Sequence, residues 1–192
     1  MNESHSKNRT KVAIYGHSQI REFTKHPPPE FKLVNLKFFF LSGAKINDLK
    51  STTVIEEIAE FSPELIILFI GGNDIVNGNS VDKIYNELVS LKIHIENLLQ
   101  PFYGTYVFEI ESRLKPKFIS PAGYKCIKNS LNRKIKSKSQ LKFLPLTKFG
   151  LVPELNIDGV HFNSMGLCIL LNAIKVHIRD IIFGKSFDIS KL

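Results

Sequence analysis

The longest run of consecutive apolar residues, LIILFI at positions 65–70, limits the folds open to this chain. Its six residues are far fewer than the roughly 20 that a membrane-spanning helix needs. A strand that is apolar on both faces is typical of the centre of a parallel sheet covered by helices on each side. The run ends at two glycines, which indicate a turn. It therefore predicts a buried strand within a layered α/β fold.

The rest of the chain alternates between strand-like and helix-like patterns. Strands are expected at residues 11–16, 36–41, 65–70, 103–110 and 141–146, and helices at 46–61, 81–98, 121–138 and 165–183. The helix at 81–98 has the clearest apolar stripe, and Ser80 is its candidate N-cap. The proline-rich residues 26–30 are expected to form a loop, and residues 71–74 a turn. This alternation predicts a three-layer α/β/α sandwich with a five-stranded parallel sheet.

Length and composition predict one domain over residues 11–183, with a flexible polar tail at 1–10 and a C-terminal tail at 184–192. A chain of 192 residues suits one domain, and a hydrophobic fraction of 43% excludes an intrinsically disordered protein. The polar N-terminus shows no secretion signal, so we expect an intracellular protein. Cys126 and Cys168 are too few for a disulfide framework and are expected to be buried. No Cys/His spacing suggests zinc, and we expect neither a metal nor an organic cofactor.

Positive charge is concentrated in one segment. The net charge is +8, and residues 113–142 contain ten Lys or Arg and no acid. A local positive field attracts polyanions, so RNA or anionic lipid is the expected partner of this segment. The helix at 121–138 is expected to present six cations to water: Lys125, Lys128, Arg133, Lys134, Lys136 and Lys138. The alternative is a charged face that only keeps the protein in solution.

The chemistry is expected in the loops that follow the strands, because open parallel sheets bind ligands at the carboxyl ends of their strands. In chain order these loops carry Ser18, Gly43, Asn73, and the pair Asp158 and His161. A serine, glycine amides, an amide side chain and a carboxylate near an imidazole are the groups that acyl transfer requires.

Most of these residues also have an ordinary structural explanation. Ser18 could cap a helix, Gly43 could serve a turn, and Asn73 could begin an Asx turn. Asp158 could cap a local turn, whereas a histidine in a loop, such as His161, has no evident packing role. Four other histidines are expected to be solvated or to lie at the rim of the site: His5, His26, His94 and His177.

The four loops together resemble the SGNH (GDSL-type) hydrolase superfamily, which carries Ser, Gly, Asn and His in four separate blocks. Ser18, Gly43, Asn73 and His161 match one block each in the same order, and Asp158 completes an Asp-x-x-His pattern. The resemblance covers roughly residues 11–183. It implies a flavodoxin-like sheet with strand order 2-1-3-4-5.

The resemblance also implies a role for each residue. Ser18 would be the nucleophile, His161 the general base, and Asp158 the acid that orients the imidazole. The oxyanion hole would consist of the backbone N–H groups of Ser18 and Gly43 and the side chain of Asn73. The sequence departs from the family at His17, where an aspartate usually organises the first loop.

A narrower resemblance connects residues 16–23, 71–75, 112–135 and 158–174 with the SGNH domains of animal retrotransposons. The OSK domain of the insect Oskar protein is a related SGNH fold that lacks catalytic residues and binds RNA. Two functions are therefore predicted. The first is a serine esterase that cleaves small acyl esters, such as acetates, through a Ser-His-Asp triad. The second is a module that binds RNA or anionic membrane through residues 113–142, with weak or vestigial catalysis. A conventional carbohydrate or lipid deacetylase is a third, weaker option.

Overall fold

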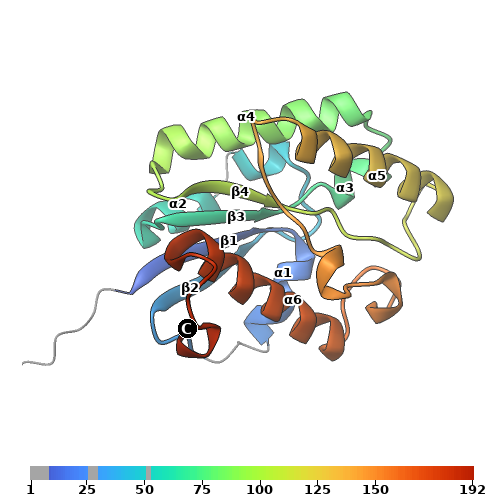
Figure 1. Ribbon diagram of the computed structural model, residues 1–192. Helices are drawn as coiled ribbons and strands as arrows, with labels where there is room; N and C mark the ends of the chain where they lie inside the picture. The colour runs from blue at the N-terminus through green and yellow to red at the C-terminus, as the bar shows by residue number, and fades with distance from the viewer. Residues whose placement is uncertain (1–8, 26–29, 51–52) are drawn as a thin grey trace, which may run out of the picture.

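A five-stranded, all-parallel sheet forms the centre of the computed structural model, which describes residues 9–25, 30–50 and 53–192 (Figure 1). Its strands are β1 (Thr10–Gly16), β2 (Val34–Phe40), β3 (Leu65–Phe69), β4 (Gly104–Phe108) and β5 (Lys142–Leu144). They lie in the order β2-β1-β3-β4-β5, and every neighbouring pair is parallel. The predicted fold class and strand order are confirmed.

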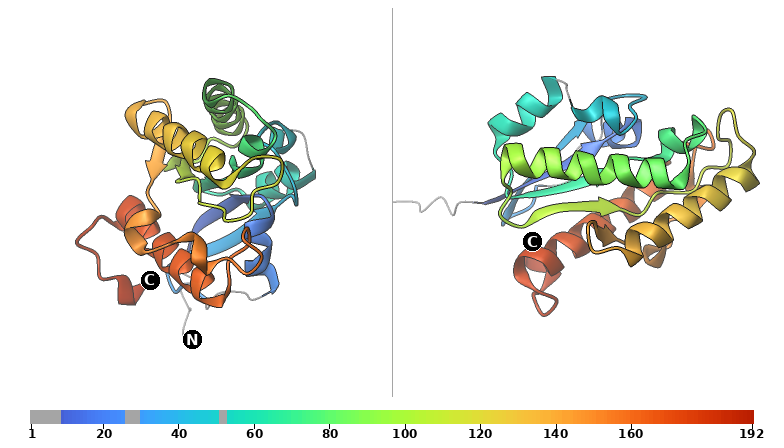
Figure 2. Two further views of the ribbon diagram at one scale, coloured as in Figure 1. Left: turned by 90° about the vertical axis from the view of Figure 1, so that its right-hand side faces the viewer. Right: turned by 90° about the horizontal axis from the view of Figure 1, so that it is seen from above.

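Helices cover both faces of the sheet (Figure 2). On one face lie α1 (Ser18–Lys25) and α6 (Ser164–Ile178), and on the other lie α2 (Thr53–Phe61), α3 (Gly72–Val76), α4 (Val81–Leu99) and α5 (Pro121–Ser137). Shorter helical turns are η1 (Asn47–Lys50), η2 (Thr147–Phe149), η3 (Pro153–Leu155), η4 (Arg179–Phe183) and η5 (Ile189–Lys191). In the part of the chain that the structure describes, no helix is both long and apolar enough to cross a membrane.

Strand β3 supplies side chains to the cores on both faces. Leu65, Ile67 and Phe69 join the core beneath α1 and α6. Ile66 and Leu68 join the core beneath α2 to α5. All five residues of the strand are buried, as expected for a central strand whose successive side chains point to opposite faces.

Polar caps in the sequence fix where two of the helices begin. Ser80 accepts a hydrogen bond from the backbone N–H of Lys83 at the start of α4, as expected. Ser120 accepts a hydrogen bond from the backbone N–H of Gly123 at the start of α5, where Pro121 occupies the first turn. Each cap satisfies one of the amide groups that a helix leaves unpaired at its N-terminus.

Several predicted elements differ from the structure. The helix expected at 46–61 begins as the 3₁₀ turn η1, and α2 starts only at Thr53, with residues 51–52 outside the described part. The carboxylates of Asp48 and Asp74 accept the backbone N–H groups of Lys45 and Ile46, which holds this stretch in a tighter turn. Residues 72–74 of the turn expected at 71–74 form the start of α3, and Gly71, with φ of 113°, is the N-cap of this helix.

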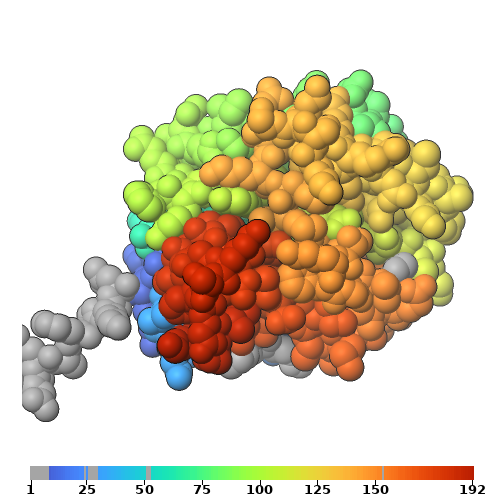
Figure 3. Space-filling model, viewed as in Figure 1, coloured from blue at the N-terminus to red at the C-terminus, as the bar shows by residue number. Residues whose placement is uncertain are grey.

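The structure describes the two expected tails to different extents. Most of the expected N-terminal tail and of the proline loop, residues 1–8 and 26–29, lie outside the described residues. Residues 184–192, expected as a tail, pack on the domain (Figure 3). The side chain of Leu192 is buried in the core beneath α6, and its carbonyl accepts the N–H of Lys32 at 2.6 Å.

Three side chains have burial opposite to that expected. Cys126 and Cys168 are exposed, because each lies on the outward face of its helix. His177, expected at the surface, is buried and its Nε2 lies 2.9 Å from the Pro145 carbonyl oxygen. A buried imidazole with such a partner is a satisfied polar group in the core.

Candidate active site

Ser18 lies where β1 ends and α1 begins. Gly16 closes the strand, His17 forms the turn, and Ser18 is the first residue of the helix. Its hydroxyl Oγ is 2.9 Å from Nε2 of His161, although 143 residues separate the two in the sequence. The distance lies within the range of a hydrogen bond.

The loop before α6 brings Asp158 and His161 together. Asp158 Oδ2 lies 2.7 Å from His161 Nδ1, and its Oδ1 accepts the backbone N–H groups of Val160 and His161 at 2.8 and 2.7 Å. Burial works to raise the pKa of Asp158, but hydrogen bonds from His161 and Val160 outweigh it and hold that pKa well below the usual range. Asp158 is thus an ionised acceptor that fixes both the ring and the backbone of His161.

Gly43 lies on the loop after β2, and Asn73 lies in the first turn of α3, which contacts that loop. Asn73 Nδ2 donates to the carbonyl of Ala44 at 2.8 Å, which places the amide beside the Gly43 loop. Ala44 N–H in turn donates to the Leu41 carbonyl, and Gly43 occupies the third position of this turn with φ of 75°. A positive φ at that position favours glycine.

Asp74, next to Asn73, secures the same loop from inside the protein. Its buried carboxylate accepts the Ile46 N–H at 3.2 Å. Burial, as the largest cause, raises the pKa of Asp74 to about 7. Asn73 and Asp74 therefore hold the loop of residues 43–46 from two sides.

Arg113 and Glu111 form a buried ion pair against Asn73, and neither is among the site residues predicted from the sequence. Arg113 Nη1 donates to Asn73 Oδ1 at 3.1 Å, and Arg113 Nη2 donates to Glu111 Oε1 at 3.4 Å. Burial is the largest single influence and works to raise the pKa of Glu111, but the guanidinium of Arg113 and the hydrogen bonds to the carboxylate, among other lowering influences, together outweigh it and hold that pKa below its usual value. The pair follows β4 directly, so the strand-end rule that selected the other loops could have found it.

Gln19, the residue after Ser18, connects the serine helix with the histidine loop. Its Nε2 donates to the Val160 carbonyl at 2.6 Å, and its Oε1 accepts the Phe162 N–H at 3.4 Å. These two residues flank His161, and the Gln19 side chain is fully buried. Nε2 also lies 3.5 Å from Glu111 Oε1, which extends the buried network from the histidine loop to Asn73.

His17 is fully buried beneath the site. Burial is the main cause that lowers the pKa of His17 to about 4, so the ring is neutral near neutral pH. Its Nδ1 accepts the Gln19 N–H at 3.4 Å, while Nε2 lies 3.8 Å from Glu111 Oε1. Because the ring is neutral, His17 and Glu111 do not form an ion pair.

The basic segment is less exposed than expected. Lys128 is buried, and its Nζ donates to Ser112 Oγ at 2.8 Å. It lies one helical turn after Tyr124 on the inward face of α5, so the prediction that it faces water is wrong. Burial lowers the pKa of Lys128. Lys134 forms an ion pair with Asp82 of α4, so this cation has a partner outside its own segment.

The remaining cations of the predicted set lie on the surface of α5 and just after it. Lys125, Arg133, Lys136 and Lys138 are exposed. Within the described ranges, no group of His, Cys, Asp and Glu side chains is arranged to hold a metal ion.

Comparison with known proteins gives a match at the level of structure. No protein-family model and no curated protein matches the sequence. A protein from Bacteroides fragilis assigned as an acylhydrolase aligns over 91% of this chain and 88% of its own, with a TM-score of 0.73 and 20% identity. A GDSL-like lipase from Bacteroides thetaiotaomicron covers 89% of this chain and 88% of its own, with a TM-score of 0.70 and 16% identity. The chain has the SGNH hydrolase fold.

A third solved structure with this fold is a carbohydrate esterase of family 3 from Talaromyces cellulolyticus. It covers 90% of this chain and 98% of its own, with a TM-score of 0.65 and 15% identity. These structures span nearly the whole SGNH fold of the chain, while the sequences have diverged widely.

Proposed function

We propose that the protein is a serine esterase of SGNH type that hydrolyses small acyl esters such as acetates. The observation that carries this proposal is the continuous contact from Ser18 Oγ to His161 Nε2 at 2.9 Å and from His161 Nδ1 to Asp158 Oδ2 at 2.7 Å. Nucleophile, base and orienting acid in this order are the requirements of a catalytic triad. The resemblance of residues 16–23 and 158–174 to retrotransposon SGNH domains supports a mobile-element origin as part of the same proposal.

The chemistry follows from the contacts. Ser18 Oγ attacks the ester carbonyl while His161 Nε2 accepts its proton, and Asp158 stabilises the resulting imidazolium. His161 then returns the proton to the leaving alcohol, which leaves the acyl group on Ser18. A water molecule, deprotonated by His161, attacks the acyl carbon; the bond to Ser18 Oγ then breaks, and His161 returns the proton to Oγ as the acid leaves.

The oxyanion of each tetrahedral intermediate would be held by the N–H groups of Ser18 and Gly43 and by Asn73. Only one of the two Nδ2 hydrogens of Asn73 is needed for the Ala44 carbonyl, which leaves the other for the substrate oxygen. Arg113 supports this role because its bond to Oδ1 fixes which end of the amide faces the site. Removing one such donor costs roughly 10²–10³ in rate.

Hydrolysis of p-nitrophenyl acetate by three variants tests the proposal. We expect Ser18→Ala, His161→Ala and the double variant to lose activity to a similar extent, because the two residues act as a unit. His94→Ala, which alters an exposed histidine on α4, is the matched control and should retain full activity. Equal hydrolysis by wild type and Ser18→Ala would refute the proposal.

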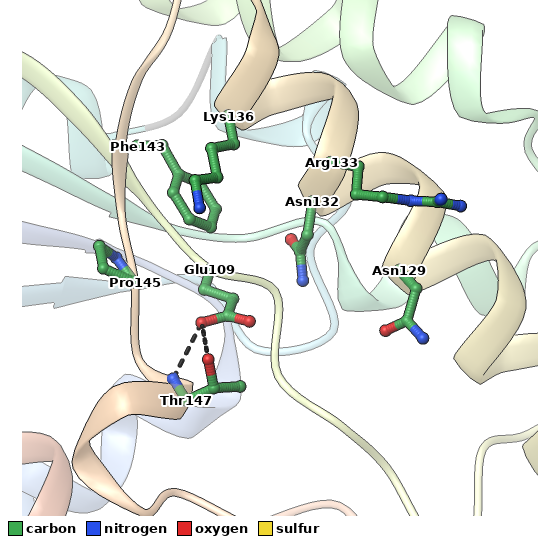
Figure 4. A pocket seen from close by; sticks show the side chains of 8 residues that line it. All are labelled: Glu109, Asn129, Asn132, Arg133, Lys136, Phe143, Pro145 and Thr147. Atoms are coloured by element: carbon green, nitrogen blue, oxygen red, sulfur yellow. Dashed lines mark hydrogen bonds between the residues drawn. The ribbon is translucent and has the colours of Figure 1, made fainter.

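A second candidate function is binding of single-stranded RNA by the exposed cations of α5. The supporting observation is a cavity of about 520 Å³ between α5 and the segment after β4 and β5 (Figure 4). Arg133 and Lys136 line it together with the ring of Phe143, on which a base could stack. Glu109 lies on the opposite wall, where its Oε2 accepts the N–H and the hydroxyl of Thr147.

A salt titration tests this second function. If about four cations contact phosphate, the logarithm of the RNA affinity should fall with the logarithm of salt concentration with a slope near −3, at ~0.7 per contact. Replacing Arg133, Lys134, Lys136 and Lys138 by glutamine should flatten this slope without changing ester hydrolysis. Equally weak binding by wild type and this variant would show that the surface only solubilises the protein.

A further inference from the structure

A cavity of about 370 Å³ lies next to the candidate active site, and the mechanism above uses only Arg113 of the residues that line it. Its walls come from the segment after β4, through Ser112 and Leu114, and from the first turns of α5, through Ala122 and Tyr124. The volume is within the range of small-molecule sites, which starts at about 300 Å³. It is large enough for a ring-sized group.

Two contacts place this cavity beside the proposed oxyanion hole and beside the loop that carries Asp158 and His161. Arg113 lines the cavity and also donates to Asn73 Oδ1, the amide proposed to bind the oxyanion. The backbone N–H of Leu114 donates at 2.9 Å to the carbonyl of Gly159, which lies between Asp158 and His161. The cavity is therefore connected to the loop that carries Asp158 and His161.

The cavity combines apolar walls with one uncompensated positive charge. Leu114, Pro121 and Ala122 supply apolar surface. Of the described residues that line it, Arg113 and Lys125 are cations and none is an acid. The charge of Arg113 is balanced by Glu111, whereas Lys125 is exposed and has no acidic partner among the described residues. The N-terminal end of α5 adds a further preference for a negative group.

We infer that this cavity binds the alcohol part of the substrate ester, and that this part is an apolar group carrying an anion. The inference rests on the proposed esterase function. The apolar body would occupy the walls formed by Leu114 and Ala122, and its carboxylate, sulfonate or phosphate would face Lys125. Such binding of a remote group positions the ester carbonyl over Ser18.

Two acetyl esters that differ only in charge test the inference. We would measure kcat/KM for p-acetoxybenzoate and for its neutral methyl ester, and take the ratio of anionic to neutral substrate. Dividing the ratio of each variant by that of wild type removes the intrinsic reactivity of the two esters. We expect Lys125→Gln to lower the ratio about threefold to fivefold, the effect of one partly exposed ion pair.

Three further variants complete the test. Lys125→Arg should retain the preference for the anionic ester, and Lys125→Glu should lower it further than Lys125→Gln. Lys83→Gln makes the same charge change on α4, away from the cavity, and should leave the ratio unchanged.

The outcomes separate this inference from the proposed function. If neither ester is cleaved in a Ser18-dependent way, the esterase proposal fails and the inference fails with it. If both are cleaved in a Ser18-dependent way but Lys125→Gln and Lys125→Glu keep the wild-type ratio, only the inference is overturned.

Discussion

At the scale of single residues, His17 makes the free energy of unfolding depend on pH. Its ring is fully buried beside Glu111 and has one nitrogen without a hydrogen-bond partner among the described groups. Burial disfavours the charged ring, which is why the pKa of His17 falls to about 4. Protonation of His17 therefore favours the unfolded chain.

The sign of this effect can be measured. Between about pH 6.5, the usual histidine pKa, and about pH 4, the unfolded chain binds more protons at this position than the folded one. Relative to His17→Gln, wild type should lose about 1 kcal/mol in free energy of unfolding between about pH 7 and about pH 5.5. Urea unfolding of both proteins at both pH values checks this. The contribution of the raised pKa of Asp74 is common to wild type and His17→Gln, so it cancels in the difference between their free energies of unfolding.

A matched control accompanies this comparison. His94→Gln alters an exposed histidine on α4 and should follow wild type at both pH values. An identical pH dependence in wild type and His17→Gln would contradict the neutral, buried state of His17.

The residues of the site divide into those that the sequence could predict and those that it could not. Ser18 and Asn73 begin helices just after strands, and His161 lies in the loop before α6, so all three are at positions where this fold places its functional residues. The contact of Gln19 with Val160 joins residues that are 141 positions apart, and no local pattern indicates it. The position of Lys128, one helical turn after the inward-facing Tyr124, indicates that it is buried. Its charge instead favoured the prediction that it faces solvent.

At the scale of elements, Gln19 couples α1 to the loop before α6. The side chain holds the backbone on both sides of His161, while Ser18 begins the same helix. The buried amide of Gln19 thus contributes to the relative position of nucleophile and base. Small displacements of such groups reduce rates strongly.

Replacing Gln19 by leucine removes both contacts with a side chain of similar size. We expect kcat for p-nitrophenyl acetate to fall about 10²-fold, with a smaller change in KM, because the substrate still binds while Ser18 and His161 lose their alignment. Gln19→Glu should lose at least as much, because it places a second buried carboxylate beside Glu111 and removes the amide donor to the Val160 carbonyl. Parallel falls in kcat and in the folded fraction, measured by circular dichroism, would show a purely structural role instead.

The elements themselves were predictable in type but not in extent. The apolar run at 65–70 and the stripe at 81–98 identify β3 and α4 because burial alone determines both. The helix expected at 46–61 is interrupted because the carboxylate of Asp74, a distant residue, accepts the N–H of Ile46. Such a contact between loops has no signal in the local sequence.

At the scale of the whole molecule, β3 unites the two cores. Ile66 faces the core under α4 and α5, Ile67 faces the core under α6, and both are fully buried. The parallel order of the sheet places β3 at its middle, between β1 and β4. The two helical layers should therefore unfold together.

Truncation on either face of β3 tests this cooperativity. We expect Ile66→Ala and Ile67→Ala each to lower the free energy of unfolding by about 2–5 kcal/mol, since each leaves a cavity in a packed core. Tyrosine fluorescence and far-ultraviolet circular dichroism should report one coincident transition in both variants. Two separate transitions in either variant would show that the layers fold independently.

The central claim, that Ser18 is a nucleophile activated by His161 and Asp158, is tested most directly by covalent labelling. We would incubate wild type, Ser18→Ala and His161→Ala with a fluorophosphonate probe, which reacts with activated serine hydroxyls, and locate the adduct by peptide mass spectrometry. We expect one adduct, on Ser18, that is absent from Ser18→Ala and forms far more slowly in His161→Ala. Equal labelling of all three proteins, or an adduct on another serine alone, would contradict it.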